Sequence, residues 1–392
     1  MKKFLAFLAC AMFAVPTFAQ EAKEEKKGFK FEVVKEIPIT PIKDQNQAGT
    51  CWSYSGLALI EAELLRMGKG EYDLSEMFVV FNTYMDRARA AVRTHGDVSF
   101  SQGGSFYDVL YAMENYGLVP DCEMPAGVMY GETLSNHTEL SAIADAAVNA
   151  IAEGKLRQLQ SKDNQVLWEK AVRAIHEVYL GECPTEFEYN GTTYTPIEFY
   201  NSLGLNADDY VSLTSYTHHP FYSQFVLEIP DNLMQVFDNA IDKGYTIAWG
   251  SDVSESGWLR GDMSGIAVLP DMEAKTQDLT GSDMAHWLGL SAADRQKAAK
   301  SEPTPQRWVT QEERQLAYDD YTTTDDHGML IYGTAKDQLG NEYYMVKNSW
   351  GDYGQYNGML YASKAFVRYK TMNIVVHKDA LPKDIKKKLG IK

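Results

Sequence analysis

Between Ala48 and Ile60 the chain carries no charged residue, within the stretch DQNQAGTCWSYSGLALIEAELLR. A polar, glycine-containing loop precedes this segment, and good helix formers continue it to Arg66. A helix that is apolar on nearly all sides is buried, so the segment predicts a central helix that begins at about Cys51. Glycines just beyond Arg66 mark its end.

The remaining patterns divide the chain of 392 residues into regions of different structure. Further amphipathic helices predict a helical lobe at about residues 44–120, and mixed patterns suggest inserted material at about 121–230. At about 231–375, segments such as GYTIAWGSDV and HGMLIYGT are rich in β-branched and aromatic residues with turn signals. We therefore expect an α+β fold, with a β-rich second lobe.

The N-terminus predicts export. Lys2 and Lys3 precede an apolar run that is too short to span a membrane, and the layout predicts a signal peptide, residues 1–19, cleaved after Ala19. Residues 20–28 form a charged leader, and we do not expect Cys10 to carry a lipid. The expected location is periplasmic or extracellular, and residues 380–392 form a short basic tail.

The charge and hydropathy of the chain limit the classes of partner that it is expected to bind. With 37 basic against 54 acidic residues, the formal charge of −17 opposes binding to phosphate, so we expect no nucleic-acid partner. Beyond the N-terminus no apolar run reaches the roughly 20 residues of a membrane span, so we expect no stable membrane association after signal cleavage. A homo-oligomer is possible, but no feature of the sequence supports one.

Three cysteines remain after signal cleavage: Cys51, Cys122 and Cys183. The odd number leaves at least one free thiol, and a bridge between Cys122 and Cys183 stays open. At a helix N-terminus the backbone N–H groups favour the thiolate and lower the cysteine pKa, which would make Cys51 a nucleophile. The alternative is an inert cysteine, because free cysteines are often simply buried.

A nucleophilic thiolate requires a histidine that protonates the leaving amine and a group that orients this histidine. His327 begins an apolar strand, and the strand after the next turn leads to Asn348, so antiparallel pairing would bring the two side chains together. Gln45, just before the thiol, could join the Cys51 backbone N–H as an oxyanion donor. Each of these residues alone could be an ordinary structural residue, so the prediction of a catalytic site rests on all four occurring together.

Three separated blocks, QNQAGTCWSYS, HGMLIYG and VKNSWGDYG, resemble the papain-like cysteine peptidases. The resemblance implies a two-lobe fold at residues 29–379, with a helical left lobe, a β-barrel-like right lobe and a large insertion between them. The site residues that it implies are Cys51 as nucleophile, His327 as acid and base, Asn348 as orienting amide, Gln45 as oxyanion donor, Trp350 as shield and Gly103 and Gly104 as substrate-binding glycines.

Two features resemble the bleomycin hydrolase and aminopeptidase C branch of this family. Cys51 and His327 are widely separated in sequence, and further blocks, among them QGGSFYDVLYAMENYGLVP, are similar to that branch. The resemblance implies a cysteine peptidase that acts through a thioacyl intermediate on peptide or protein substrates, with no metal or cofactor. Members of this branch are mostly cytoplasmic, and the expectation of export comes from the N-terminal signal alone. Aminopeptidase is the first expectation. An endopeptidase or oligopeptidase, a silent peptide-binding module and a thioester acyltransferase are the alternatives.

In that branch a longer C-terminal arm reaches into the cleft and limits cleavage to N-terminal residues. Here the chain stops at PKDIKKKLGIK, so we expect either a solvated basic end or a tail that enters the cleft.

Overall fold

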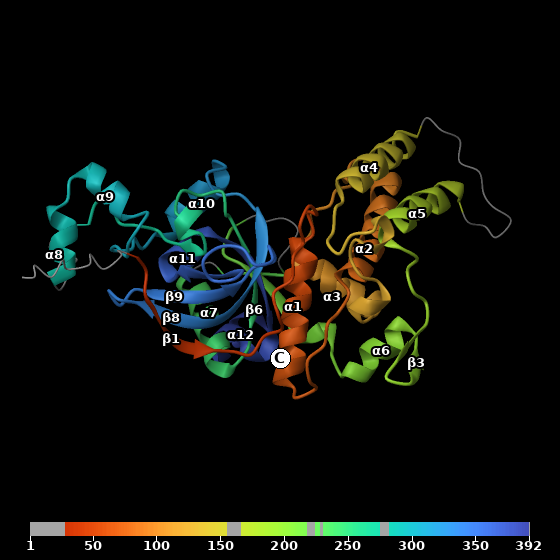
Figure 1. The fold of residues 1–392 in the computed structure, drawn as a ribbon, viewed down its shortest axis with the longest axis horizontal. Coiled ribbons are helices and arrows are strands. Elements are labelled where there is room, and N and C mark those ends of the chain that lie inside the picture. Colours follow the sequence, from red (N-terminus) through yellow and green to blue (C-terminus); the bar gives the residue numbers. More distant parts are fainter. Residues whose placement is uncertain (1–27, 155–165, 218–223, 228–229, 275–281, 392) are drawn as a thin grey trace, which may run out of the picture.

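The computed structural model describes residues 28–154, 166–217, 224–227, 230–274 and 282–391. The expected signal peptide, its Cys10 and nearly all of the charged leader lie outside the described residues. One half of the molecule is mainly helical, the other half contains a large sheet with helices around it, and α1 (Cys51–Arg66) lies between the two halves (Figure 1). The fold is of the α+β class.

Helix α1 is the buried central helix that the uncharged stretch predicts. Leu57, Ile60 and Leu64 are fully buried, and the helix packs against α3 (Phe106–Asn115) on one side and strand β8 (His327–Asp337) on the other. At Gly56 an added Cβ would lie 2.6 Å from a methyl of α3, so a glycine is required for this close packing.

The helical lobe is larger than expected. It also includes α2 (Glu76–Arg93), α4 (Thr138–Ala152), α5 (Leu167–Leu180), α6 (Pro196–Leu203), the hairpin β2 (Phe187–Tyr189) and β3 (Thr192–Tyr194), and the 3-10 turns η1 (Asp121–Glu123), η2 (Val128–Tyr130) and η3 (Ala207–Asp209). One apolar core joins α1, α2 and α3 to α4, α5 and α6. Most of the expected insertion at 121–230 therefore extends the helical lobe, because its apolar faces pack on the same core.

The second lobe is built on a nine-stranded sheet with the order β5-β4-β11-β6-β8-β9-β10-β7, and β1 pairs with β8. Its strands are β1 (Phe31–Glu36), β4 (Tyr210–Thr214), β5 (Phe225–Val226), β6 (Ile247–Ser251), β7 (Ile266–Ala267), β8, β9 (Glu342–Lys347), β10 (Met359–Ser363) and β11 (Thr371–His377). The described strands form a mixed, open sheet and no closed barrel. The second lobe therefore differs from the expected β-barrel-like lobe in that its sheet does not close.

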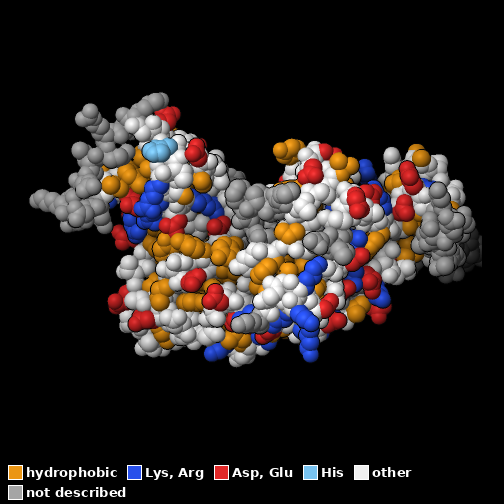
Figure 2. Space-filling model, turned by 180° about the vertical axis from the view of Figure 1, so that it is seen from behind, with side chains coloured by type: hydrophobic (Ala, Val, Ile, Leu, Met, Phe, Trp, Pro, Cys, Tyr) orange, Lys and Arg blue, Asp and Glu red, His pale blue; other side chains and the backbone are white. Residues whose placement is uncertain are grey.

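Helices accompany the sheet: α7 (Pro230–Lys243), α8 (Ser282–Gly289), α9 (Ala292–Ala298), α10 (Gln311–Asp319), α11 (Lys364–Lys370) and α12 (Lys383–Leu389), with turns η4 (Gly261–Met263) and η6 (Lys378–Ala380). α8 and α9, which the sequence patterns did not predict, project at one end of the molecule, and α4 and α5 project at the other (Figures 1 and 2). No helix of the described part is long and apolar enough to cross a membrane.

Buried charges connect the two lobes in a polar seam behind the Cys51 end of α1. The Lys43 ammonium lies 3.2 Å from Glu61 of α1 and 2.7 Å from Glu76 of α2. Thr40 donates to Glu61 at 2.6 Å and accepts from Lys347 of β9 at 2.9 Å. Because buried charges require partners, these contacts fix β9 relative to α1.

The C-terminal tail forms α12 and packs on the sheet lobe. Ile385 is buried, and Leu389 and Ile391 lie against the core that includes α7 and β11. The chain reaches this position after His377, which stacks on Tyr245. Tyr245 in turn lies under the guanidinium of Arg66, at the end of α1 opposite Cys51. The tail is therefore a docked helix.

Candidate active site

Cys51 is the first residue of α1 and lies where the two lobes meet. Thr50 caps the helix without a side-chain hydrogen bond, and the first turn contains no acidic residue. No side-chain cap therefore occupies the backbone N–H groups at the start of α1, and these groups can interact with the thiol or with a substrate. The backbone N–H groups of Gly328, Trp52 and Cys51 itself act to lower the pKa of the thiol. At Gly328 an added Cβ would lie 2.8 Å from Phe106 and 2.9 Å from the Ser55 hydroxyl.

The thiol is not acidified in this structure. Burial raises the pKa of Cys51, the Asp325 charge raises it further, and the backbone N–H groups only partly oppose them. Burial also lowers the pKa of His327 to about 4, although the hydrogen bond that the ring donates to Asn348 acts in the opposite direction. The expectation of a lowered cysteine pKa is therefore wrong, because β8 covers the helix start. Both shifts favour a neutral thiol beside a neutral imidazole.

Antiparallel pairing of β8 and β9 brings His327 and Asn348 together, as the sequence predicts. His327 Nε2 lies 2.6 Å from Asn348 Oδ1, and the same oxygen accepts the Ser349 backbone N–H at 2.8 Å. An oxygen that accepts twice requires Nε2 to donate, so Nδ1 is the basic ring nitrogen. Trp350 stacks on the imidazole, with ring centroids 4.7 Å apart, and covers this hydrogen bond.

Gln45 is held in a fixed orientation. Its Oε1 accepts from the Ser349 hydroxyl at 2.6 Å, and its Nε2 donates to the Ala48 carbonyl at 2.7 Å. A side-chain amide has two N–H donors, so one remains for another acceptor. Gln45 lines the same cleft as Cys51. A carbonyl oxygen beside the thiol can therefore meet an N–H from each of these two residues.

A cleft of about 410 Å³ contains this arrangement. It is lined by residues of both lobes: Gln45, Gly49, Cys51, Trp52, Ser101, Gly103, Gly104, Ser105, Phe106, Gly250, Asp325, Asp326, His327, Gly328 and Asn373. Asn348 and Trp350 stand directly behind His327. All seven residues expected from the sequence thus lie in or against one cleft, which can accept an extended chain beside a thiol.

The family model described as peptidase C1-like matches residues 10–241 and 307–391. The chain belongs to the peptidase C1-like family. Aminopeptidase G of Lactobacillus delbrueckii subsp. lactis is 25% identical over 406 residues, covering 89% of this chain and 83% of the relative. Aminopeptidase C of Streptococcus thermophilus is 24% identical over 395 residues, covering 91% and 84%.

The fold is similar to that of a solved structure. PepW from Lactobacillus rhamnosis HN001 superposes with a TM-score of 0.63 at 19% identity, covering 92% of this chain and 86% of that one. The comparisons place the protein among papain-like cysteine peptidases of the aminopeptidase C branch, as the sequence motifs indicate.

Arg87 of α2 holds the glycine loop of the peptidase in place. Its guanidinium donates to the carbonyls of Ser101, Gln102 and Gly103 and pairs with Asp108 at 2.8 Å. It also lies over the Trp52 ring, and an added Cβ at Gly104 would lie 2.9 Å from that ring. The loop therefore rests on an arginine and a tryptophan, and Gly104 passes close to both.

We expect Arg87→Met to raise KM for peptide substrates about tenfold and to change kcat less, because losing charged hydrogen bonds loosens the substrate-binding loop. Steady-state kinetics checks this. Arg89→Met is the matched control: Arg89, two residues on, pairs with Asp86 and Glu169 and does not contact the loop. An equal rise of KM in both variants would contradict this role.

The sequence did not single out several polar and charged residues of the site. Asp325, Asp326 and Asn373 line the cleft, and Arg87 supports it. The acidic pair immediately before His327 was a visible signal for the first two. Nothing in the sequence marked Asn373, because it reaches the cleft only through the pairing of β11 with β6.

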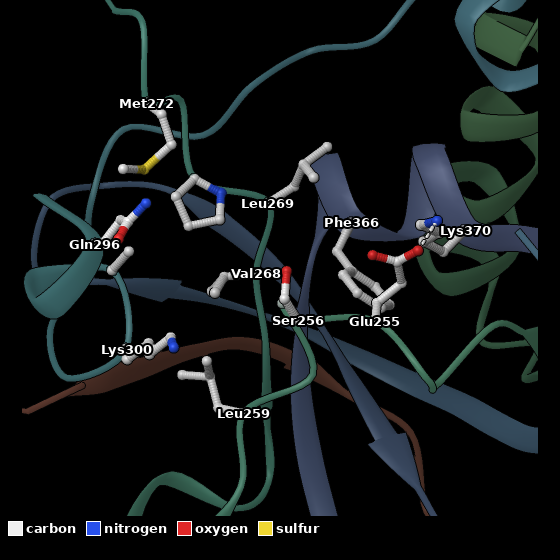
Figure 3. A pocket seen from close by; sticks show the side chains of 13 residues that line it. Glu255, Ser256, Leu259, Val268, Leu269, Met272, Gln296, Lys300, Phe366 and Lys370 are labelled. Carbon is white, nitrogen blue, oxygen red and sulfur yellow. Dashed lines mark hydrogen bonds and ion pairs between the residues drawn. The ribbon is translucent and has the colours of Figure 1, made fainter. Parts of the chain in front are cut away.

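A second cavity, of about 390 Å³, lies on the sheet lobe between α9, α11 and the segment that includes β7 (Figure 3). Its walls are mainly apolar, with the ion pair of Glu255 and Lys370 at one side. Of the seven residues expected from the sequence, none lines it. The cleft at Cys51 is therefore the candidate active site. The three described cysteines are all free, so Cys122 and Cys183 form no bridge.

Proposed function

We propose that this protein is a cysteine aminopeptidase that releases N-terminal residues through a thioacyl intermediate. The observation that carries the proposal is the 2.6 Å contact of His327 with Asn348, in the cleft that contains the Cys51 thiol. The relatives named above are aminopeptidases by their printed names, which supports N-terminal cleavage as the reaction.

In the first step the Cys51 thiol passes its proton to His327 Nδ1 while its sulfur bonds to the substrate carbonyl carbon. The neutral pair becomes charged only as the bond forms, which fits the raised pKa of the thiol and the lowered pKa of the imidazole. The carbonyl oxygen becomes an oxyanion, and the N–H of Cys51 and that of Gln45 stabilise it.

In the second step the imidazolium gives its proton to the leaving amine, the C–N bond breaks, and a thioester remains on Cys51. Water then attacks the thioester with His327 as general base, which returns the thiol and releases the amino acid. Asn348 accepts from Nε2 throughout, so the ring keeps Nδ1 toward the thiol.

Two substrates test this proposal: an aminoacyl coumarylamide and the same compound acetylated at its amine. The expected result is cleavage of the free compound and slow or no cleavage of the acetylated one, with both activities blocked by an epoxysuccinyl thiol reagent that labels Cys51. Faster cleavage of the blocked compound or of internal bonds would establish an endopeptidase instead.

Deleting Lys386 to Lys392 should leave the ratio of free to blocked cleavage unchanged, because none of the described residues after Asn373 lines the cleft. It should lower the free energy of unfolding by about 2 kcal/mol, since Leu389 and Ile391 lose apolar contacts. Thermal or urea unfolding measures the second effect. A changed ratio of activities would restore the model of a tail that gates the cleft.

We further propose export, which rests on the N-terminal sequence alone: two lysines, an apolar run and a cleavage position after Ala19. Mass spectrometry of the protein from the periplasm or medium of its host should find a chain that starts at Gln20. Intact residues 1–19 on a chain retained in the cytoplasm would refute the proposal.

A further inference from the structure

The cleft has an acidic wall with one unused carboxylate. Two of its lining residues, Asp325 and Asp326, are acidic, and no lysine or arginine is among the described residues that line it. Asp326 is occupied: its carboxylate accepts from Val253 N at 3.2 Å, Ser254 N at 3.1 Å and the Thr324 hydroxyl at 2.7 Å. It belongs to the framework of the turn before β8.

Asp325 is different, because its side chain accepts no hydrogen bond from any described residue. Both neighbours are fixed: Thr324 N donates to Asp252 at 3.2 Å, and Asp326 holds the turn after β6. The backbone at Asp325 is therefore held on both sides while its carboxylate faces the open cleft. Although the side chain is exposed, desolvation by the surrounding protein, followed by the Asp326 charge, raises the pKa of Asp325 to about 6.

A carboxylate that faces the cleft and has no hydrogen-bond partner among the described residues is suited to bind a cation. Asp325 and the Cys51 thiol line the same cleft. The substrate cation nearest the scissile bond of an aminopeptidase is the α-ammonium group, which is on the same residue as the carbonyl carbon that the thiol attacks. Among the described residues, α12 contributes none to the lining of the cleft, whereas Asp325 lines it.

We propose that Asp325 binds the α-ammonium group of the substrate and so limits the peptidase to free N-termini. This inference rests on the proposed aminopeptidase function and names the residue that determines it. A longer peptide bound across the cleft would place an uncharged amide beside Asp325, leaving the carboxylate without its cation. The bound ammonium would also offset the charge that disfavours the Cys51 thiolate.

The test compares wild type with Asp325→Asn, which keeps the shape and removes the charge, and with Asp325→Glu, which keeps the charge. We expect kcat/KM for the aminoacyl coumarylamide to fall about 10- to 100-fold in Asp325→Asn and less in Asp325→Glu, with cleavage of the acetylated compound unchanged or faster. Asp384→Asn, an exposed residue of α12, is the control for net charge. Equal losses on both substrates, or no loss, would overturn the inference.

The pH dependence gives a readout that damage to the fold would not produce. The groups facing Asp325 are Asp326, Cys51 and His327. As pH rises through about 6 the Asp325 carboxyl becomes charged, so kcat/KM for the free substrate should rise there. It should fall again near pH 8, where an α-amino group loses its proton. Asp325→Asn should lack the limb near pH 6, and retention of that limb would contradict the role.

Labelling of Cys51 separates failure of this inference from failure of the proposed function, because it needs no turnover. An aminoacyl chloromethyl ketone should label wild type faster than its N-acetyl analogue, and Asp325→Asn should lose this preference. Iodoacetamide, which has no amine, should label Asp325→Asn faster than wild type at about pH 7.5, since the thiol loses a negative neighbour. A wild type without preference for the free amine would overturn the inference even if the enzyme cleaves peptides.

Discussion

Cys51→Ala will abolish hydrolysis of the aminoacyl substrate and leave the protein folded. Without the sulfur there is no thioester, and loss of a nucleophile lowers kcat by about 10⁶. Alanine is the best helix former, and Cys51 is only partly buried at the helix start, so α1 should form as before. Kinetics and circular dichroism measure the two outcomes.

Cys122→Ala serves as the control for this prediction. Cys122 is exposed in the 3-10 turn η1 and is not among the residues lining the cleft, so its loss should leave kcat and KM unchanged. If Cys51→Ala turned over substrate at the wild-type rate, the nucleophile would have to be another group, and the mechanism would fall.

Gln45→Ala should lower kcat by about 10²–10³ and change KM less. Its free N–H is placed to meet the oxygen only when that oxygen becomes an anion, so its loss affects the transition state more than substrate binding. Comparison of kcat and KM with the wild-type values checks the split.

A control for Gln45 comes from its own hydrogen bonds. Ser349→Ala removes the hydroxyl that holds Gln45 Oε1 but leaves both N–H donors, so its loss of kcat should be much smaller. If Gln45→Ala raised KM at constant kcat, Gln45 would be a residue of substrate binding, and the oxyanion would need another donor.

Local patterns were sufficient to predict α1 and the pairing of β8 with β9. The uncharged stretch before Arg66 requires burial, and the strands that carry His327 and Asn348 follow each other across one short turn. The relation of Cys51 to His327 came only with the family motifs, since no local rule connects residues so far apart. The open sheet and the helices α8 and α9 were not predicted, because strand order depends on pairings distant in sequence.

The electrostatics of the site were the least predictable part. A helix start alone suggests an acidic thiol, but β8 lies over it and burial outweighs the N–H groups. The unpaired state of Asp325 likewise depends on what its neighbours bind: two turns satisfy Asp326 and Asp252, and nothing described reaches Asp325. Such properties come from contacts among residues of four separate segments.

The polar seam between the lobes affects how the peptidase tolerates sequence change. Glu61 accepts a hydrogen bond from the Thr40 hydroxyl, which in turn accepts one from the Lys347 ammonium. Because Lys347 directly precedes Asn348, these hydrogen bonds hold the orienting amide in position. Removing one partner of such a buried pair costs about 3–5 kcal/mol, which selects strongly against change there. The side chain of Asp325 in the wall of the cleft is not held by such hydrogen bonds from the described residues. Evolution can therefore exchange wall residues such as Asp325, and with them the preferred substrates, while the catalytic distances stay constant.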